Sequence, residues 1–279
     1  MTAMPTDRRA PLSAPQQSTA LQSLAVRFPP SLLGWLLPAL IAAVGGVLRF
    51  FRLGAPGTLI FDETYYVKEG WSLTQFGYER EWPEEPNPAF EAGDPWGVLE
   101  TGDFIVHPPL GKWMIGAGIQ LFGQDSSFGW RFAAAVVGTL SILIVGLIAW
   151  RLFRSAWLAA IASLLLAIDG EHLVHSRTSL LDIFLMFFVL LAFWLLIEDR
   201  VRTRDRIERA LDAAGPGATP SQLGRHLGAR PAWFLPETWG PSLGIRWYRL
   251  AAGVALGCGM GVKWSGLYAL AVFGLLTVA

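Results

Sequence analysis

Two adjacent carboxylates at positions 62 and 63 are the first residues with clear chemical potential. Asp62 and Glu63 follow a long apolar run by about ten residues and lie between Phe61 and Tyr65. Side chains of neighbouring residues cannot share one face of a helix or strand, so the two carboxyls serve different tasks or none. Nearby membrane and aromatic rings can desolvate one carboxyl and make it a stronger base. The alternative is a solvated acidic loop.

A second polar cluster begins at His107 and ends at Lys112. Pro108 and Pro109 fix an extended entry, and the apolar stretch after them ends at Phe122, too short to span a bilayer. We expect this stretch to lie in the membrane interface as an amphipathic helix. His107 alone fits either a packing residue or a catalytic one, and the spacing leaves both open.

Charged residues beside long apolar runs form a third group. Arg131 begins one run, Arg177 and Asp182 enter another, and Lys263 lies between two short ones. Charges at such depth are costly and usually face a cavity, a partner or an ion pathway. The alternatives are interface anchors at Arg131 and Lys263 and a structural ion pair between Arg177 and Asp182. Together the three cations would suit a phosphate.

The composition is that of a membrane protein. Of 279 residues, 53% are hydrophobic and 16% charged, whereas charged residues make up about 25% of soluble domains. The 22 basic and 22 acidic residues cancel, which disfavours nucleic-acid binding. Cys258 is the single cysteine, so an intrachain disulfide and a cysteine-based metal centre are excluded. His172 and His175 lack further ligands, and we expect no metal site.

Six apolar segments should form membrane helices. Three are long enough to cross, at about 25 to 28 Å as helix, and three of thirteen or fourteen residues are short. The long ones are 32–48, 132–150 and 180–197, and the short ones are 156–168, 250–262 and 266–279. The first begins too far along the chain for a removable signal peptide. Because the sequence ends inside an apolar run, we expect it to be the front part of a longer protein.

The loops between these segments differ in charge. Residues 52–130 hold four basic and twelve acidic residues, whereas residues 198–249 hold nine arginines and six acids. The positive-inside rule therefore predicts that 52–130 is the first extracytoplasmic loop and that 198–249 is cytoplasmic. Residues 1–31 show no apolar period and are expected to be a disordered cytoplasmic tail before a membrane domain at 32–279.

The motifs, taken in order, resemble those of the protein O-mannosyltransferase family. The resemblance covers roughly residues 32–279 and lies in the family's amino-terminal half. It implies an all-α polytopic membrane protein of the GT-C type with a large first outer loop carrying interfacial helices. The motifs that carry it are Phe61-Asp62-Glu63, His107-Pro108-Pro109-Leu110-Gly111-Lys112, Trp130-Arg131-Phe132, Ser176-Arg177 with Leu180-Leu181-Asp182, and Val262-Lys263-Trp264-Ser265-Gly266.

This resemblance implies transfer of mannose from polyprenyl or dolichyl phosphate mannose to Ser or Thr hydroxyls of exported proteins. The expected reaction is a single displacement with inversion, without cofactor or metal, outside the cell membrane and near the secretion translocon. The pair Asp62 and Glu63 is expected to supply the base: Asp62 is preferred, with Glu63 positioning the acceptor or the loop, and the reverse order is the alternative. The phosphate ligands are expected to be Arg131, Arg177 and Lys263, with support from His107, Lys112 and Asp182.

Two other functions fit the same residues. A related transferase could place the sugar on a glycolipid or a polysaccharide. A transporter should show broken helices in two related halves with polar residues near mid-membrane. The sequence has no internal repeat and its polar clusters lie at segment ends, which favours the transferase.

Overall fold

The computed structural model describes residues 30–95, 97–227 and 243–278, whose regular structure is helical. In these ranges the one β pairing is an isolated bridge between Arg80 and Gly102. The all-α prediction is confirmed, whereas residues 1–29 of the expected tail lie outside the described residues. The helices are α2 (Pro30–Phe50), α3 (Glu63–Phe76), α4 (Asn87–Glu91), α5 (Leu110–Phe122), α6 (Ser127–Phe153), α7 (Ala156–Ile168), α8 (Gly170–His175), α9 (Leu181–Ala214), α10 (Pro220–His226), α11 (Trp247–Val262) and α12 (Gly266–Val278).

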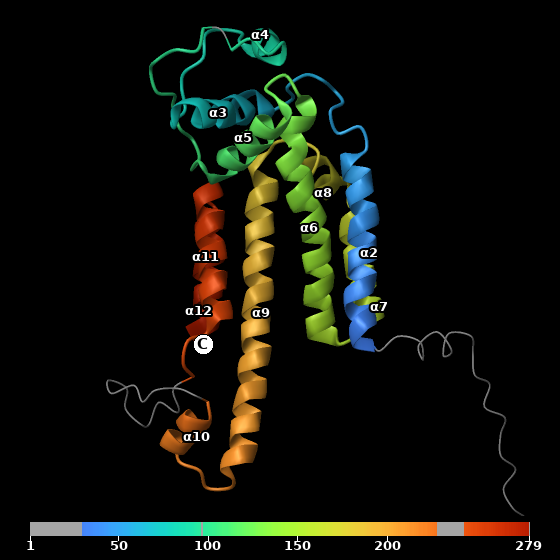
Figure 1. Ribbon diagram of the computed structural model, residues 1–279, viewed down its shortest axis with the longest axis vertical. Coiled ribbons are helices and arrows are strands. Elements are labelled where there is room, and N and C mark those ends of the chain that lie inside the picture. Colours follow the sequence, from blue (N-terminus) through green and yellow to red (C-terminus); the bar gives the residue numbers. More distant parts are fainter. Residues whose placement is uncertain (1–29, 96, 228–242, 279) are drawn as a thin grey trace, which may run out of the picture.

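The helices form a bundle with a layer across one of its ends. Helices α2, α6, α9 and α11 run side by side, while α3 and α5 lie across one end (Figure 1). Helix α7 packs on α2 and α6, and α12 packs on α11. Helices α2, α6 and α9 are long and apolar enough to cross a membrane, as expected for a multi-pass membrane protein, whereas α7 and α12 are shorter.

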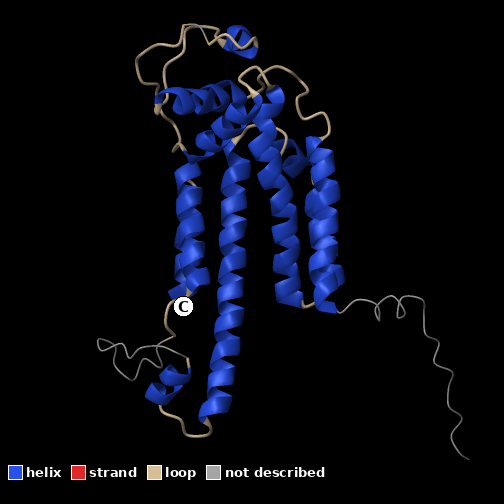
Figure 2. Ribbon diagram, viewed as in Figure 1, coloured by secondary structure: helices blue, strands red, loops and turns tan. Residues whose placement is uncertain are grey.

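Helix α9 extends much further than the apolar pattern predicted. It continues to Ala214, so the segment expected to be a loop from residue 198 begins as helix. Ion pairs four residues apart stabilise this extension, one between Arg202 and Glu198 at 3.2 Å and one between Arg204 and Glu208 at 2.8 Å. The arginine-rich end therefore projects beyond the bundle, away from α3 and α5 (Figure 2).

Helix α5 begins directly after the double proline, as the sequence predicted. It crosses the end of the bundle beside α3 (Figure 1). The two helices approach closely because each has a glycine at the contact. A Cβ on Gly70 would lie 2.7 Å from the carbonyl oxygen of Lys112, and one on Gly116 would lie 2.5 Å from that of Gly70. Larger residues would push the layer apart.

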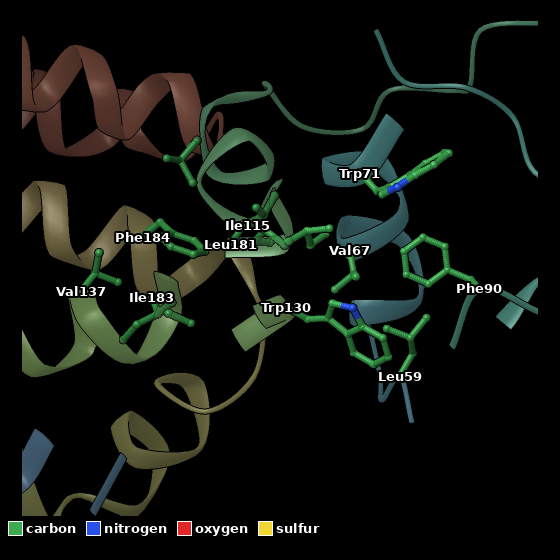
Figure 3. Packing of buried hydrophobic residues seen from close by; sticks show 13 residues of the cluster. Leu59, Val67, Trp71, Phe90, Ile115, Trp130, Val137, Leu181, Ile183 and Phe184 are labelled. Carbon is green, nitrogen blue, oxygen red and sulfur yellow. The ribbon is translucent and has the colours of Figure 1, made fainter. Parts of the chain in front are cut away.

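The main apolar core joins this layer to the bundle. Val67 of α3, Ile115 of α5 and Trp130 of α6 are fully buried within it (Figure 3). Leu181 and Phe184 bring in the first turn of α9. The ends of several chain segments are thereby held together at one place, which is where the polar motifs meet.

Candidate functional site

Adjacent residues Asp62 and Glu63 have opposite environments. Phe61, at φ 51°, makes a left-handed turn just before α3, and Asp62 is the N-cap residue but makes no side-chain cap bond. Asp62 remains partly exposed, whereas Glu63 is 0% exposed. The two adjacent carboxyls therefore differ in their access to solvent.

Glu63 is held by four hydrogen bonds. Its Oε1 accepts from Arg131 Nε at 2.8 Å and from the backbone N–H of Ser179 at 2.9 Å. Its Oε2 accepts from Arg131 Nη2 at 2.7 Å and from the backbone N–H of Ile60 at 3.1 Å. Glu63 thereby joins α3 to α6 and to the turn before α9. Because each carboxylate oxygen already accepts two hydrogen bonds, neither is open to a substrate hydroxyl.

Arg131 has no N–H left for a phosphate in this arrangement. Beyond Glu63, it donates to the carbonyl oxygens of Leu53 at 3.3 Å, Pro56 at 2.7 Å and Thr58 at 3.0 Å. These bonds and the two to Glu63 use all five donors of a guanidinium. The side chain is 1% exposed. Arg131 therefore holds the loop between α2 and α3 in this structure, and its contact with a phosphate stays a prediction.

Arg177 also binds backbone. Its Nη1 lies 2.8 to 2.9 Å from the carbonyl oxygens of Leu48, Arg49 and Phe51, which share its two N–H groups, and its Nη2 donates to that of Arg52 at 3.2 Å. These carbonyls lie at the C-terminal end of α2, where helix groups are unpaired and a cation is favourable. Of the three cations expected to line one phosphate site, Arg131 and Arg177 therefore have structural partners.

Lys263 and Asp182 form an accessible ion pair. Lys263 Nζ lies 2.7 Å from Asp182 Oδ1, and the two side chains are 24% and 50% exposed. Lys263 stands in the extended turn between α11 and α12, and Asp182 stands in the first turn of α9. The pairing of Asp182 with Arg177 considered from the sequence is replaced by this one. Lys263 stays reachable for an anionic group.

His107 and a tyrosine complete the cluster. The rings of His107 and Tyr66 lie 6.2 Å apart. Burial lowers the pKa of His107, and the cations of Lys263 and Lys112 lower it further while Asp182 and Asp62 oppose them. His107 is therefore neutral at neutral pH. The charges of residues as far apart in sequence as Asp62 and Lys263 thus act on the same imidazole.

Tyr66 is a site residue that sequence reasoning missed. Burial raises its pKa to about 12, and the carboxylates of Asp62, Glu69 and Asp182 add to this effect. The phenol keeps its proton and can donate a hydrogen bond. Its position four residues after Asp62, hence on the same face of α3, was the available signal.

Lys112 is a buried support for the layer. It is 0% exposed and lies 2.9 Å from Glu69 and 3.1 Å from Glu79. Burial raises the pKa of Glu69, against the lowering effect of Lys112. The lysine ties α5 to α3 and to the segment after α3, and so fixes the extended stretch that carries His107. In the part of the chain that the structure describes, no group of three or more His, Cys, Asp and Glu residues could hold a metal.

The chain is similar to known protein mannosyltransferases. Residues 106–209 match a family model described as dolichyl-phosphate-mannose-protein mannosyltransferase. The chain is 39% identical to the polyprenol-phosphate-mannose–protein mannosyltransferase of Mycolicibacterium smegmatis (strain MKD8), over 88% of this chain and 41% of the relative. The protein of the same name from Corynebacterium glutamicum is 36% identical, over 86% and 41%. The chain thus spans about two fifths of the length of these relatives.

The fold is similar to that of a eukaryotic complex. The structure of the Saccharomyces cerevisiae protein O-mannosyltransferase Pmt1–Pmt2 complex bound to the sugar donor matches with a TM-score of 0.56 and 21% identity. The match covers 93% of this chain and 29% of that one. This likeness confirms the expected membrane fold of the GT-C type.

Proposed function

Because the chain belongs to the protein O-mannosyltransferase family, we propose that it carries the catalytic base and the donor site of an enzyme that mannosylates proteins. The donor is polyprenyl phosphate mannose, and the acceptors are Ser and Thr hydroxyls of exported proteins, met near the secretion translocon. The observation that supports this best is the cluster at the end of the bundle, where the free carboxylate of Asp62 stands among His107, Asp182 and Lys263.

Asp62 is the base in this proposal. The acceptor oxygen attacks the anomeric carbon, its proton passes to Asp62, and the bond from that carbon to the phosphate oxygen breaks. The electron pair leaves with the lipid phosphate, so one displacement inverts the anomeric centre. Glu63 cannot replace Asp62, because both of its oxygens already accept hydrogen bonds and it has no exposed surface.

Lys263 binds the departing phosphate. It is a partly exposed cation, and a dianionic phosphate competes with Asp182 for it. The neutral His107 and the protonated Tyr66 can donate hydrogen bonds at the same place. Arg131 and Arg177 act through position, since they hold the chain before α3 and the end of α2 in place.

We place this site on the outer side of the membrane. The cluster lies at the end of the bundle opposite the arginine-rich extension of α9, and arginines favour the cytoplasmic side (Figure 1). Cysteines introduced at Glu85 and Gly215, after Cys258 is replaced by Ser, test this with an impermeant thiol reagent on intact cells. We expect labelling at position 85 alone, and labelling at position 215 alone would reverse the orientation.

The chemistry is tested by transfer of mannose from the lipid phosphate to a Ser/Thr-rich peptide in membranes. Asp62→Asn keeps the shape but cannot accept the proton, so turnover should fall about a hundredfold while donor binding persists. Lys263→Met should weaken donor binding roughly tenfold or more, as expected for a lost charge-assisted hydrogen bond. The exposed change Glu208→Gln on α9 is the matched control.

Two results would contradict the proposal. Near-normal turnover of Asp62→Asn would move the base elsewhere. Transfer by the wild type to a glycolipid, with none to the peptide, would support the related transferase instead.

A further inference from the structure

Two adjoining hollows lie at the end of the bundle opposite the Asp62 cluster, where α9 passes the start of α11 (Figure 1). The first, called the apolar groove, has a volume of about 680 Å³ and runs over the first two turns of α11. The second, called the basic hollow, has a volume of about 350 Å³ and lies on the arginine-rich extension of α9. Arg246 lines both, so they meet at this side chain.

The apolar groove is open and aliphatic. Ile245, Leu250 and Val254 line it and are 57 to 68% exposed. Gly253 gives the groove its depth, because a Cβ at this position would meet nothing within 4 Å. An aliphatic surface of this kind is covered favourably by hydrocarbon and unfavourably by water.

The level of the groove in the membrane follows from the contacts between α9 and α11. Leu256 packs with Ala192 in the apolar part of α9. Arg246 and Arg249 both pair with Asp199, at which that apolar part has ended. The groove therefore begins at the level of the lipid headgroups and continues to the depth of the acyl chains.

The basic hollow adds to an excess of positive charge at the headgroup level. Arg204 pairs there with Glu208 at 2.8 Å, while Arg200 has no ion pair among the residues that the structure describes. Together with the two arginines that share Asp199, four arginines face two carboxylates, which leaves two positive charges. Guanidinium groups in such an excess favour a phosphate, whose oxygens accept their hydrogen bonds.

We propose that the apolar groove and the basic hollow together bind one anionic phospholipid. An acyl chain lies in the groove along Gly253, and the phosphate lies at Arg246 and Arg249. A free anion would leave the aliphatic surface uncovered, a zwitterionic lipid would bring no net charge to the arginines, and an apolar protein segment would leave two positive charges unbalanced. An anionic phospholipid matches both surfaces, and its headgroup contacts α9 as well as α11.

Retention of lipid by the purified protein tests this site without any transfer reaction. The probes are dioleoyl phosphatidylglycerol and dioleoyl phosphatidylcholine in equal amounts, and native mass spectrometry from detergent counts the lipids that stay bound. We expect the wild type to retain one phosphatidylglycerol in preference to phosphatidylcholine. Arg249→Gln should lower retention of phosphatidylglycerol about fivefold, the effect of one arginine near an anionic headgroup, and leave phosphatidylcholine unchanged. Arg225→Gln on α10, an exposed arginine that lines neither hollow, is the control.

A second variant tests the acyl chain. Gly253→Leu fills the groove, and it should fold normally because its Cβ meets no neighbour and leucine favours a helix. We expect it to lower retention of phosphatidylglycerol about tenfold, the effect of roughly two methylenes that lose their cover. Gly274→Leu on α12 is the matched control, since its surroundings are equally open and it lies outside the groove.

Three results would overturn the inference. The first is equal retention of the two lipids by the wild type. The second is unchanged retention of phosphatidylglycerol in either Arg249→Gln or Gly253→Leu. The third is displacement of the lipid by glycerol 3-phosphate, which carries the phosphate without acyl chains and would show a site for a free anion.

Discussion

The two ends of the bundle hold their charged residues in different ways. At the end covered by α3 and α5, the arginines bind mostly backbone carbonyls of irregular chain, as Arg131 does between Leu53 and Thr58. At the other end, arginines bind carboxylates of α9, where Arg151 of α6 pairs with Glu198 and Arg246 pairs with Asp199. The first arrangement shapes loops around a site, while the second fastens helix to helix.

This difference determines what the loss of one partner leaves behind. Without Arg131, the buried Glu63 and three loop carbonyls would lose donors at once. Without Arg151, Glu198 would still pair with Arg202 at 3.2 Å. The end of the bundle with two arginines on one carboxylate should therefore tolerate the loss of one arginine. The end where Arg131 alone binds several loop carbonyls should not.

The largest effect should follow from Arg131→Ala. Removing one partner of a buried ion pair costs about 3 to 5 kcal/mol, because the other charge stays buried. Thermal unfolding in detergent, followed by tryptophan fluorescence, should show this loss, and Arg131→Lys should recover little since a lysine lacks the five donors. Asp62→Asn, one residue from Glu63, is the control and should unfold like the wild type. If Arg131→Ala were as stable as the wild type, the two ends of the bundle would not differ in their dependence on a single arginine.

A smaller effect is expected at the opposite end. Glu198→Gln removes the buried charge that Arg151 and Arg202 share, but the two arginines left behind are 18% and 54% exposed and can reach water, and Gln still accepts a hydrogen bond. We expect about 1 kcal/mol of destabilisation and unchanged mannose transfer. The same unfolding assay measures it, with Glu208→Gln in the exposed pair as the control. A loss as large as that of Arg131→Ala would mean that the ends are equivalent.

The smallest effect concerns pH. Burial raises the pKa of Glu69 in the folded protein, so its protonated form is favoured there. Its contribution to stability is full below its unfolded pKa and is lost as pH rises through the folded value. In the wild type, the melting temperature should therefore fall as the pH rises above 4.5, the ordinary pKa of a glutamic acid side chain. In Glu69→Gln, which cannot ionise at this position, this fall should be smaller. If the melting temperature of this variant depended on pH as in the wild type, burial of Glu69 would not be the cause of the fall.

The helices could largely be anticipated from apolar pattern and proline. The long apolar helices, the helix after Pro109 and the short helix at Ala156–Ile168 lie where the pattern placed them. The extension of α9 to Ala214 was not predicted, because its stability depends on ion pairs between side chains four residues apart rather than on an apolar stripe. The sequence motifs that contain the site residues could be recognised, but the hydrogen-bond and ion-pair partners of these residues could not.

Sequence was sufficient to establish a helical membrane protein with polar motifs at helix ends, because hydropathy and charge act locally along the chain. The assignment of Asp62 to the accessible cluster and of Glu63 to the buried pair could come only from folding. Adjacent residues of like charge look alike in a sequence, and they differ once one faces solvent and the other meets Arg131. Contacts such as Lys263 with Asp182 join residues 81 positions apart, which local pattern cannot register.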